Sequence, residues 1–235
     1  VELNSLSILN NFIECIQNNT FSDLKSLTIL NLDFNLISAI EYEAFRGIRT
    51  LEMLLLEENY LTTLHPNLFT DLNRLTHLSF AGNNLESIRN EAFAGLTDCL
   101  ERLYLYNNEI RHVESGAFEN LRKLSVLSLM RNRISYLDID LFLHLTNLQT
   151  LDLSSNLLEI LGNMVFSGLV MLNSLNLQNN MIKQIEPDAF RDLNSSLLFL
   201  DLQTNQLSSL RKESFTNLAN LKELHLSSNK LTEIT

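Results

Sequence analysis

The sequence predicts an α/β-type solenoid of ten coils. We expect a parallel concave β-sheet of short strands and a convex side of loops and short 3-10 or extended pieces. Two observations predict this architecture: the chain repeats itself every 24 or 25 residues, and each copy alternates apolar residues where a strand would bury one face. With 45% hydrophobic and 19% charged residues over 235 positions, the chain has enough apolar material to fold.

The repeat has the frame L-x-x-L-x-L-x-x-N-x-L-x-x-L, and frame positions are counted from its first leucine. The ten copies fill the chain, so residues 1–235 are expected to form a single array. Each copy is expected to be one coil, because repeats of this length form one structural unit that buries its apolar face only against its neighbours. Coils 1 to 10 open at Leu3, Leu27, Leu51, Leu75, Leu100, Leu124, Leu148, Leu172, Leu197 and Leu221.

Frame positions 4 and 6 predict the strand of each coil. Both are large and apolar in every copy, as in Leu30 and Leu32, which is the period-2 pattern of a strand with one buried face. Parallel stacking then places positions 3, 5 and 7 on the opposite, concave face, with position 8 at its margin.

Two further positions are constant. Position 9 is Asn in all ten copies, and a column of amides that donate and accept hydrogen bonds would satisfy the backbone as it leaves each strand. Position 19 is Phe in the nine copies that reach it, which predicts an inner aromatic spine. The nine phenylalanines are Phe21, Phe45, Phe69, Phe93, Phe118, Phe142, Phe166, Phe190 and Phe215. The segment of each copy that contains this Phe is too short for a full-length helix.

Charge and residue placement argue against several functions. A formal net charge of -11 disfavours nucleic-acid binding, which requires a basic surface, and no apolar run approaches the roughly 20 residues of a membrane-spanning helix. The five His occupy unrelated frame positions, so we expect no catalytic residues, no metal site and no cofactor. His77 and Ser79 share one strand, where we expect at most a hydrogen-bonded pair.

The repeat resembles the leucine-rich repeat horseshoe, in particular its 24-residue "typical" class, which carries A-F-x-x-L on the convex side. Ala44-Phe45 and Ala117-Phe118 show that signature. One extra residue precedes Leu100 and another precedes Leu197. The array with these lengthened repeats most closely resembles chaoptin-like adhesion proteins; Toll-like and Slit-like ectodomains are the next most similar. The resemblance implies an extracellular or cell-surface glycoprotein without enzymatic activity.

The ends, cysteines and sequons carry further expectations. The cysteine-rich caps of that family are not present, so we expect a longer array, with any membrane anchor outside these residues. Cys15 and Cys99 lie three to four coils apart, too far to pair; each is expected to be a buried free thiol or to bond outside the array. Asn18 and Asn194 begin N-x-S/T sequons on the convex return, and we expect glycans there.

The concave face is the predicted binding surface. Its apolar and aromatic side chains gather toward coils 2 to 6, apart from Leu198 and Phe199 in coil 9, whereas coils 7, 8 and 10 present polar residues. Rigid aromatics with a polar rim are the composition of a protein-binding hot spot. For Ile29 and Met53 a second interpretation stays open, in which they only pack on each other as cross-strand neighbours. The predicted site is Ile29, Phe34, Met53, Leu55, Glu57, Arg102, Tyr104, Tyr106, Met130 and Arg131.

These features predict non-catalytic protein–protein recognition. The partner would be a protein ligand or, homophilically, a second copy, bound by a cell-surface adhesion or receptor ectodomain. The alternative is a structural or extracellular-matrix scaffold that assembles through lateral or end-to-end contacts.

Overall fold

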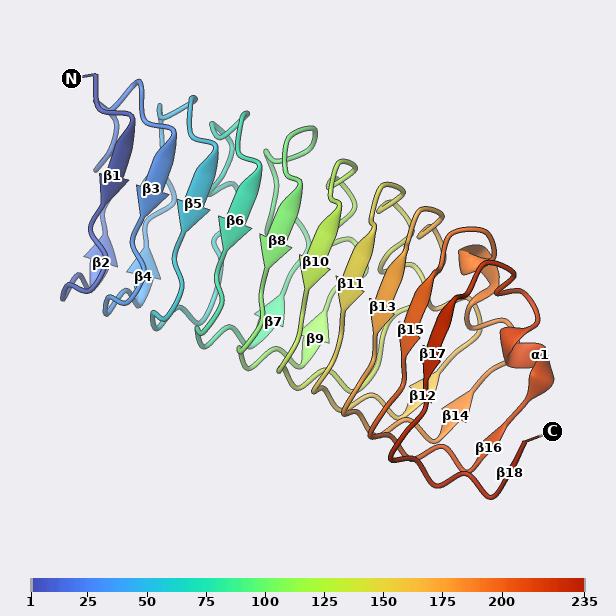
Figure 1. The fold of residues 1–235 in the computed structure, drawn as a ribbon. Coiled ribbons are helices and arrows are strands. Elements are labelled where there is room, and N and C mark those ends of the chain that lie inside the picture. Colours follow the sequence, from blue (N-terminus) through green and yellow to red (C-terminus); the bar gives the residue numbers. More distant parts are fainter. Residues whose placement is uncertain (1, 235) are drawn as a thin grey trace.

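The chain winds into ten successive coils that stack side by side, each contributing one strand to a continuous sheet (Figure 1). The computed structural model describes residues 2–234. All pairings in this ten-stranded sheet are parallel. The strands are β1 (Ser5–Ser7), β3 (Ile29–Asn31), β5 (Met53–Leu55), β6 (His77–Ser79), β8 (Arg102–Tyr104), β10 (Val126–Ser128), β11 (Thr150–Asp152), β13 (Ser174–Asn176), β15 (Phe199–Asp201) and β17 (Glu223–His225).

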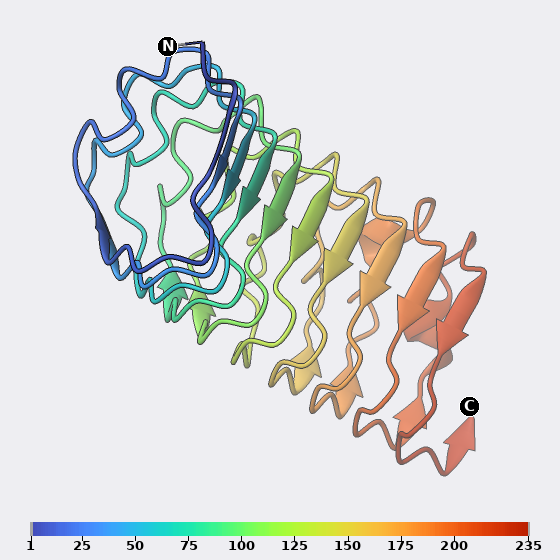
Figure 2. The same cartoon turned by 60° about the vertical axis from the view of Figure 1, so that its left-hand side comes forward.

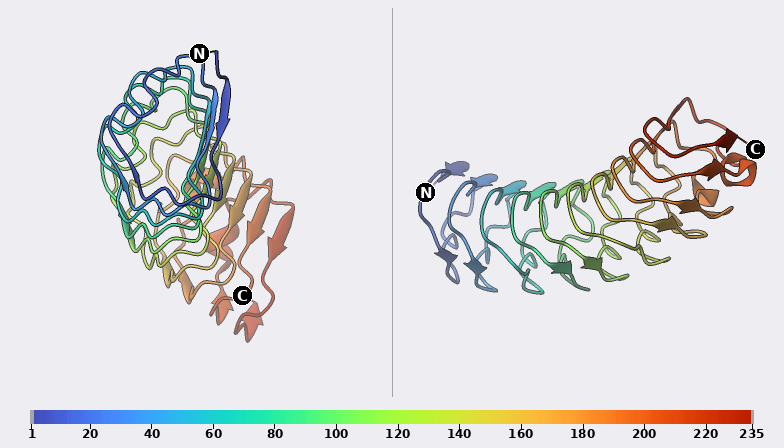
Figure 3. Two further views of the ribbon diagram at one scale, coloured as in Figure 1. Left: turned by 90° about the vertical axis from the view of Figure 1, so that its left-hand side faces the viewer. Right: turned by 90° about the horizontal axis from the view of Figure 1, so that it is seen from below.

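The register of the sheet follows the repeat. Equivalent frame positions face each other across every pair, as Leu30 faces Leu54 and Leu127 faces Leu151. The array bends along its length with the sheet on the inner side of the curve, and N and C mark opposite ends of the stack (Figures 2 and 3). The predicted solenoid with a concave parallel sheet is therefore confirmed.

The leucines and phenylalanines fill the interior of the coils. Leu30, Leu54 and Leu78 on the buried face of the sheet have no exposed surface. Opposite them the position-19 rings stack from coil to coil, as in Phe142 on Phe166, whose ring centroids are 6.2 Å apart and inclined by 15°. Burying each Phe removes a large apolar area from water, so this spine contributes strongly to stability.

The asparagine column forms as predicted. Asn132 donates from Nδ2 to the carbonyl of Leu129 in its own coil (3.0 Å) and to that of Leu105 in the preceding coil (2.9 Å). Its Oδ1 accepts from the N–H of Ile110, again in the preceding coil (3.0 Å). Since the same pattern recurs along the array, each amide satisfies buried backbone groups and joins two coils.

The convex side is made of turns, short extended pieces and very little helix. Residue pairs of adjacent coils form four separate two-stranded ladders. In the described part of the chain, coils 3 and 6 contribute no strand to them. The ladders are β2 (Cys15–Ile16) with β4 (Ala39–Ile40), β7 (Ser87–Ile88) with β9 (His112–Val113), β12 (Ile160–Leu161) with β14 (Gln184–Ile185), and β16 (Ser209–Leu210) with β18 (Glu233–Ile234).

Two helical turns interrupt the convex side near the C-terminal end. They are the 3-10 helix η1 (Arg191–Leu193) and the four-residue helix α1 (Lys212–Phe215). Over residues 2–234, the structure contains no helix with the length and apolarity needed to cross a membrane.

The residue three positions after each strand of the main sheet adopts a left-handed backbone conformation in every coil. At position 8 the φ angles run from +50° at Glu58 to +67° at Gly82, and nine of the ten residues are not glycine. The N–H of this residue donates to the position-7 carbonyl of the next coil, as Phe34 does to Glu57 (2.9 Å). That bond fixes a conformation which side-chain sterics disfavour.

Candidate functional site on the concave sheet

The concave sheet buries position 4 and exposes its flanking positions to different extents. In β3, Leu30 is buried while Ile29 is exposed, and in β8, Leu103 is buried while Arg102 is exposed. The predicted site residues Met53, Leu55, Tyr104 and Met130 are half-buried, and Phe34 and Arg131 are exposed at the margin. The structure thus places all ten predicted residues on this face or at its edge.

Glu57 is the centre of a polar cluster that joins four coils. Its carboxylate accepts a hydrogen bond from Ser79 Oγ (2.6 Å) on Oε1 and one from the hydroxyl of Tyr106 (3.3 Å) on Oε2. Its backbone N–H donates to Asp33 Oδ1 (2.7 Å). Two of the predicted residues, Glu57 and Tyr106, are therefore brought together although coil 4 lies between their coils.

A small residue makes this long reach feasible. Ala81 stands at position 7 of coil 4, between Glu57 and Tyr106 at position 7 of coils 3 and 5, and it is only 1% exposed. The next residue is Gly82, where a Cβ would lie 2.3 Å from a carboxylate oxygen of Glu58. The sequence prediction did not include Ser79 and Ala81 in the site. The feature of the sequence that could have identified them is the run of small residues Ser79, Ala81 and Gly82 in coil 4, between the large residues of coils 3 and 5.

The cluster shifts the pKa values of two of its members. Burial raises the pKa of Asp33, and the nearby Glu57 carboxylate raises it further, although the hydrogen bond from the Glu57 N–H acts the other way. Burial also raises the pKa of the Tyr106 hydroxyl, with Glu57 and Glu58 adding to it. Both groups therefore favour their neutral form more than they would in water.

The two tyrosines of coil 5 form an edge-to-face pair. The ring centroids of Tyr104 and Tyr106 are 6.3 Å apart and the planes are inclined by 75°. Such a pair holds both rings in place, which lowers the entropy that a partner would have to remove on binding. Tyr106 is also tied to Glu57, so it is fixed to the sheet rather than free to extend from it.

The remaining predicted residues lie around this pair. Ile29 and Met53 face each other in register across β3 and β5, so they are cross-strand neighbours, and they also keep exposed area. Arg102 faces His77 across β6 and β8. Burial lowers the pKa of His77, and the positive charge of Arg102 lowers it further.

His77 and Ser79 share β6, where the sequence allowed at most a hydrogen-bonded pair. His77 and Ser79 do not pair: the His77 ring is 2.8 Å from Thr76 Oγ1, and Ser79 donates to Glu57. Each of the two side chains therefore bonds to another neighbour, although alternate residues do pair elsewhere on the sheet, as Glu223 and His225 do (3.7 Å).

In the C-terminal coils the concave face is polar and internally bonded. Asn176 donates to Asp152 (3.4 Å), and Gln203 contacts both Asp201 and His225. Phe199 packs edge-to-face on His225, with ring centroids 5.1 Å apart. In residues 2–234, no group of three His, Cys, Asp or Glu side chains is placed to hold a metal ion.

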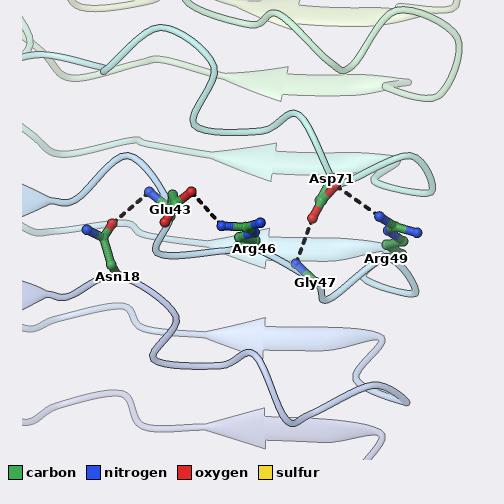
Figure 4. Close-up of polar contacts among 6 residues, drawn as sticks. All are labelled: Asn18, Glu43, Arg46, Gly47, Arg49 and Asp71. Atoms are coloured by element: carbon green, nitrogen blue, oxygen red, sulfur yellow. Dashed lines mark hydrogen bonds and ion pairs between the residues drawn. The ribbon is translucent and has the colours of Figure 1, made fainter.

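The convex side carries contacts that link coils 1 to 3 (Figure 4). Asp71 accepts from the N–H of Gly47 (2.8 Å) and pairs with Arg49 (3.6 Å). Asn18 Oδ1 accepts from the N–H of Glu43 (2.8 Å), and Glu43 pairs with Arg46 (2.7 Å). The bonds of Asp71 and Asn18 join neighbouring coils outside the sheet, whereas the Glu43–Arg46 pair lies within coil 2.

Both sequon asparagines lie on this outer side. Asn18 is half-buried, with its oxygen bonded to the next coil, and no hydrogen bond within the described residues engages its Nδ2. Asn194 follows η1 and is exposed.

The cysteines are both free, Cys99 buried and Cys15 exposed. The buried-thiol prediction is correct for Cys99, whose pKa is raised by burial, and wrong for Cys15. Cys15 lies in β2 at an outward position of the first coil, beside Ile16, which is buried.

Comparisons with known proteins agree with this architecture. The model of the leucine rich repeat matches residues 98–158, 122–182, 146–202 and 195–235, and that of the BspA type leucine rich repeat region matches residues 1–125. A search of curated proteins found no match.

Three solved structures are similar. FLRT2, the leucine-rich repeat component of an octameric complex with Latrophilin 3 and Unc5D, has a TM-score of 0.83 and 28% identity, over 96% of this chain and 68% of that one. TLR13, in a complex with ssRNA13, has a TM-score of 0.77 and 26% identity, over 97% and 37%. Toll in its complex with Spatzle, from Drosophila, has a TM-score of 0.76 and 22% identity, over 97% and 35%.

This chain spans about a third of the length of the Toll and TLR13 chains. The chaoptin-like relationship is not among these similarities. Together the two family models cover the whole array, and the fold has the concave sheet and asparagine column that the repeat predicts. The chain belongs to the leucine-rich repeat family.

Proposed function

We propose that the chain is a non-catalytic recognition module that binds a protein ligand on its concave sheet, as part of a cell-surface adhesion or receptor ectodomain. The observation that carries this proposal is the group of half-exposed apolar and aromatic side chains in coils 2 to 6, centred on the Tyr104–Tyr106 pair. The equivalent positions of coils 7 and 8 are Thr, Asp, Ser, Asn and Gln, which gives the sheet one preferred region.

The similar structures support the choice of a protein partner. Toll and FLRT2 were both solved in complexes with other proteins. TLR13 was solved with RNA, but the net charge of -11 opposes a polyphosphate ligand for this chain. An extracellular or cell-surface location, with glycans on Asn18 and Asn194, belongs to the same proposal; a mass shift on glycosidase treatment tests the glycans.

The test is a binding screen with a matched pair of variants. The chain is displayed on beads and screened against an array of purified cell-surface ectodomains and against itself. Tyr104→Ala with Tyr106→Ala removes the aromatic pair, whereas Thr150→Ala with Ser174→Ala changes equivalent strand positions in the polar coils. Circular dichroism confirms that both variants remain folded.

We expect the tyrosine variant to lose at least about tenfold in affinity, because a few buried aromatic side chains supply most of the binding free energy of a protein interface. The Thr150 and Ser174 variant should bind like the wild type. If both variants bind equally well, the concave site is refuted. If instead both variants still assemble with other copies of the chain, laterally or end to end, the scaffold alternative is favoured.

A further inference from the structure

A second apolar surface lies along the edge of the concave sheet, on the turns that follow β1, β3 and β5, and it shares the marginal residue Phe34 with the concave site. Phe12 is 85% exposed, Tyr60 55% and Phe34 54%, and Leu9 and Leu36 are exposed beside them. We call these five residues the rim patch. Folded proteins seldom leave neighbouring large apolar side chains in water unless they bind something there.

The stacking of the coils makes these residues neighbours. Phe12, Leu36 and Tyr60 occupy position 10 of coils 1, 2 and 3. The backbone N–H of Leu36 donates to Ile13 of the previous coil (3.0 Å), and that of Tyr60 donates to Ile37 (2.9 Å). Hydrogen-bonded extended segments lie about 4.8 Å apart, so the three side chains form one row. In coil 4 the same position is Asn84, which ends the row.

The sequence segments that carry the rim patch contain carboxylates and no basic residue. Positions 2 to 14 of coils 1 to 4 contain no Lys or Arg. Their six carboxylate residues are Glu14, Asp33, Glu52, Glu57, Glu58 and Glu86.

The basic residues of the first three coils lie elsewhere. Lys25, Arg46, Arg49 and Arg74 occupy positions 20 to 24, on the return to the next strand. Arg46 and Arg49 lie there on the loops that Figure 4 shows. The rim patch is therefore an aromatic and aliphatic surface bordered by negative charge.

We propose that the rim patch binds a protein segment that combines apolar or aromatic anchors with flanking Lys or Arg residues. The anchors would cover Phe12, Leu36 and Tyr60, and the cations would lie against Glu58 and its acidic neighbours. Charge complementarity selects this partner. A nucleic acid lacks the cations, and two copies meeting through this same surface would bring like charges together. The inference needs no ligand on the concave sheet and goes beyond the proposed function.

The probe is a labelled peptide in which Lys alternates with Phe and Leu, followed by fluorescence anisotropy. One counterpart has Glu in place of Lys, and another has Ser in place of Phe and Leu. The Lys–Phe–Leu peptide should bind at least about tenfold tighter than both, since it alone supplies anchors and cations. Its affinity should fall as salt rises, because exposed charges are screened.

Variants distinguish specific binding at the rim patch from nonspecific binding to exposed apolar side chains. Phe12→Ser with Tyr60→Ser should weaken the Lys–Phe–Leu peptide by about tenfold or more, as loss of two anchors implies. The matched control is Leu157→Ser with Met181→Ser, which changes exposed apolar residues at the same frame position in coils 7 and 8 and should leave binding unchanged. Glu58→Gln should weaken binding and flatten its salt dependence.

Three results would overturn the inference. These are equal binding of the Lys and Glu peptides, equal losses in the rim and control variants, and self-association of the wild-type chain in sedimentation velocity that Phe12→Ser with Tyr60→Ser abolishes. The tyrosine variant of coil 5 should keep its affinity for the peptide. Failure of concave binding is thereby distinguishable from failure of the rim patch.

Discussion

The hydroxyl of Tyr106 donates a hydrogen bond to Glu57 across the full width of the intervening coil, at an oxygen-to-oxygen distance of 3.3 Å. The two residues are 49 positions apart in sequence and equivalent in the repeat. Because Ala81 lies between them, the bond ties coil 5 to coil 3 directly, in addition to the sheet.

Tyr106→Phe should therefore lower the free energy of unfolding by about 0.5–1.5 kcal/mol, the usual net contribution of one hydrogen bond. Equilibrium urea unfolding measures the loss. Tyr104→Phe is the control, since no hydrogen bond of the Tyr104 hydroxyl is found among the described residues. An equal loss in both variants would contradict the role of the bond.

The same bond predicts a pH dependence. The pKa of Tyr106 is raised in the folded chain, so the native state holds this proton more tightly than the unfolded state does. The stability that it contributes is fully present below the ordinary tyrosine pKa of about 10 and is lost as pH rises through the higher folded value. Tyrosinate absorbance should show that Tyr106→Phe removes a titration that lies above the ordinary tyrosine pKa.

Asp33→Asn should stabilise the chain at neutral pH. The amide oxygen can still accept the N–H of Glu57, while the repulsion from the Glu57 carboxylate disappears. We expect a gain below about 1 kcal/mol, since the site is partly solvated. Because the folded pKa of Asp33 is raised, the difference from wild type should shrink as pH falls through that folded value and be gone below the ordinary aspartate pKa of about 4. Urea unfolding at several pH values checks this; a gain that persists in acid would contradict it.

Asn132→Ala should be costly because it removes the partner of four buried or half-buried backbone groups. We expect a loss of at least about 2 kcal/mol, since each orphaned group costs about 1–3 kcal/mol. Asn11 has the same frame position but is exposed and bonds only within its own coil, so Asn11→Ala should cost less than about 1 kcal/mol. Similar losses at both sites in thermal unfolding would refute the inter-coil role of the column.

Two glycines on the convex side of coil 7 should respond differently to substitution by Ala. Gly168 has a φ of +88°, and a Cβ there would lie 2.2 Å from the carbonyl oxygen of Leu143. Gly168→Ala should therefore destabilise by more than about 1 kcal/mol. A Cβ at Gly162 would meet nothing within 4 Å, so Gly162→Ala should be close to neutral. Parallel chemical unfolding of the two variants measures the contrast.

The architecture was predictable because a period of 24 or 25 residues constrains every copy at once. Leu30, Asn35 and Phe45 have equivalents throughout the chain, so their burial follows from the stack rather than from local propensity. The concave position of the ten predicted site residues follows from strand alternation in the same way.

What could not be predicted depends on contacts between unlike residues. The hydrogen bond from Tyr106 to Glu57 forms only because the residue between them, Ala81, is small. It therefore depends on the side chains of three successive coils at once. The exposure of Cys15, by contrast, follows from the frame, because its position 13 is exposed or half-buried in the other coils as well, as at Ala39 and Gln184. The rim patch uses position 10, which varies freely from copy to copy and therefore carries no signal in the repeat.

The four ladders of the convex wall have a mechanical consequence. The inner sheet is continuous over ten strands, whereas the outer ladders join coils in pairs and leave coils 3 and 6 with isolated hydrogen bonds to their neighbours there, such as that from Tyr60 N–H to the Ile37 carbonyl. Stiffness is therefore distributed unevenly, and flexing of the arc should concentrate at these two coils. Coil 3 carries Glu57 and Tyr60, so one of the two predicted sites of bending lies where the concave cluster and the rim patch meet.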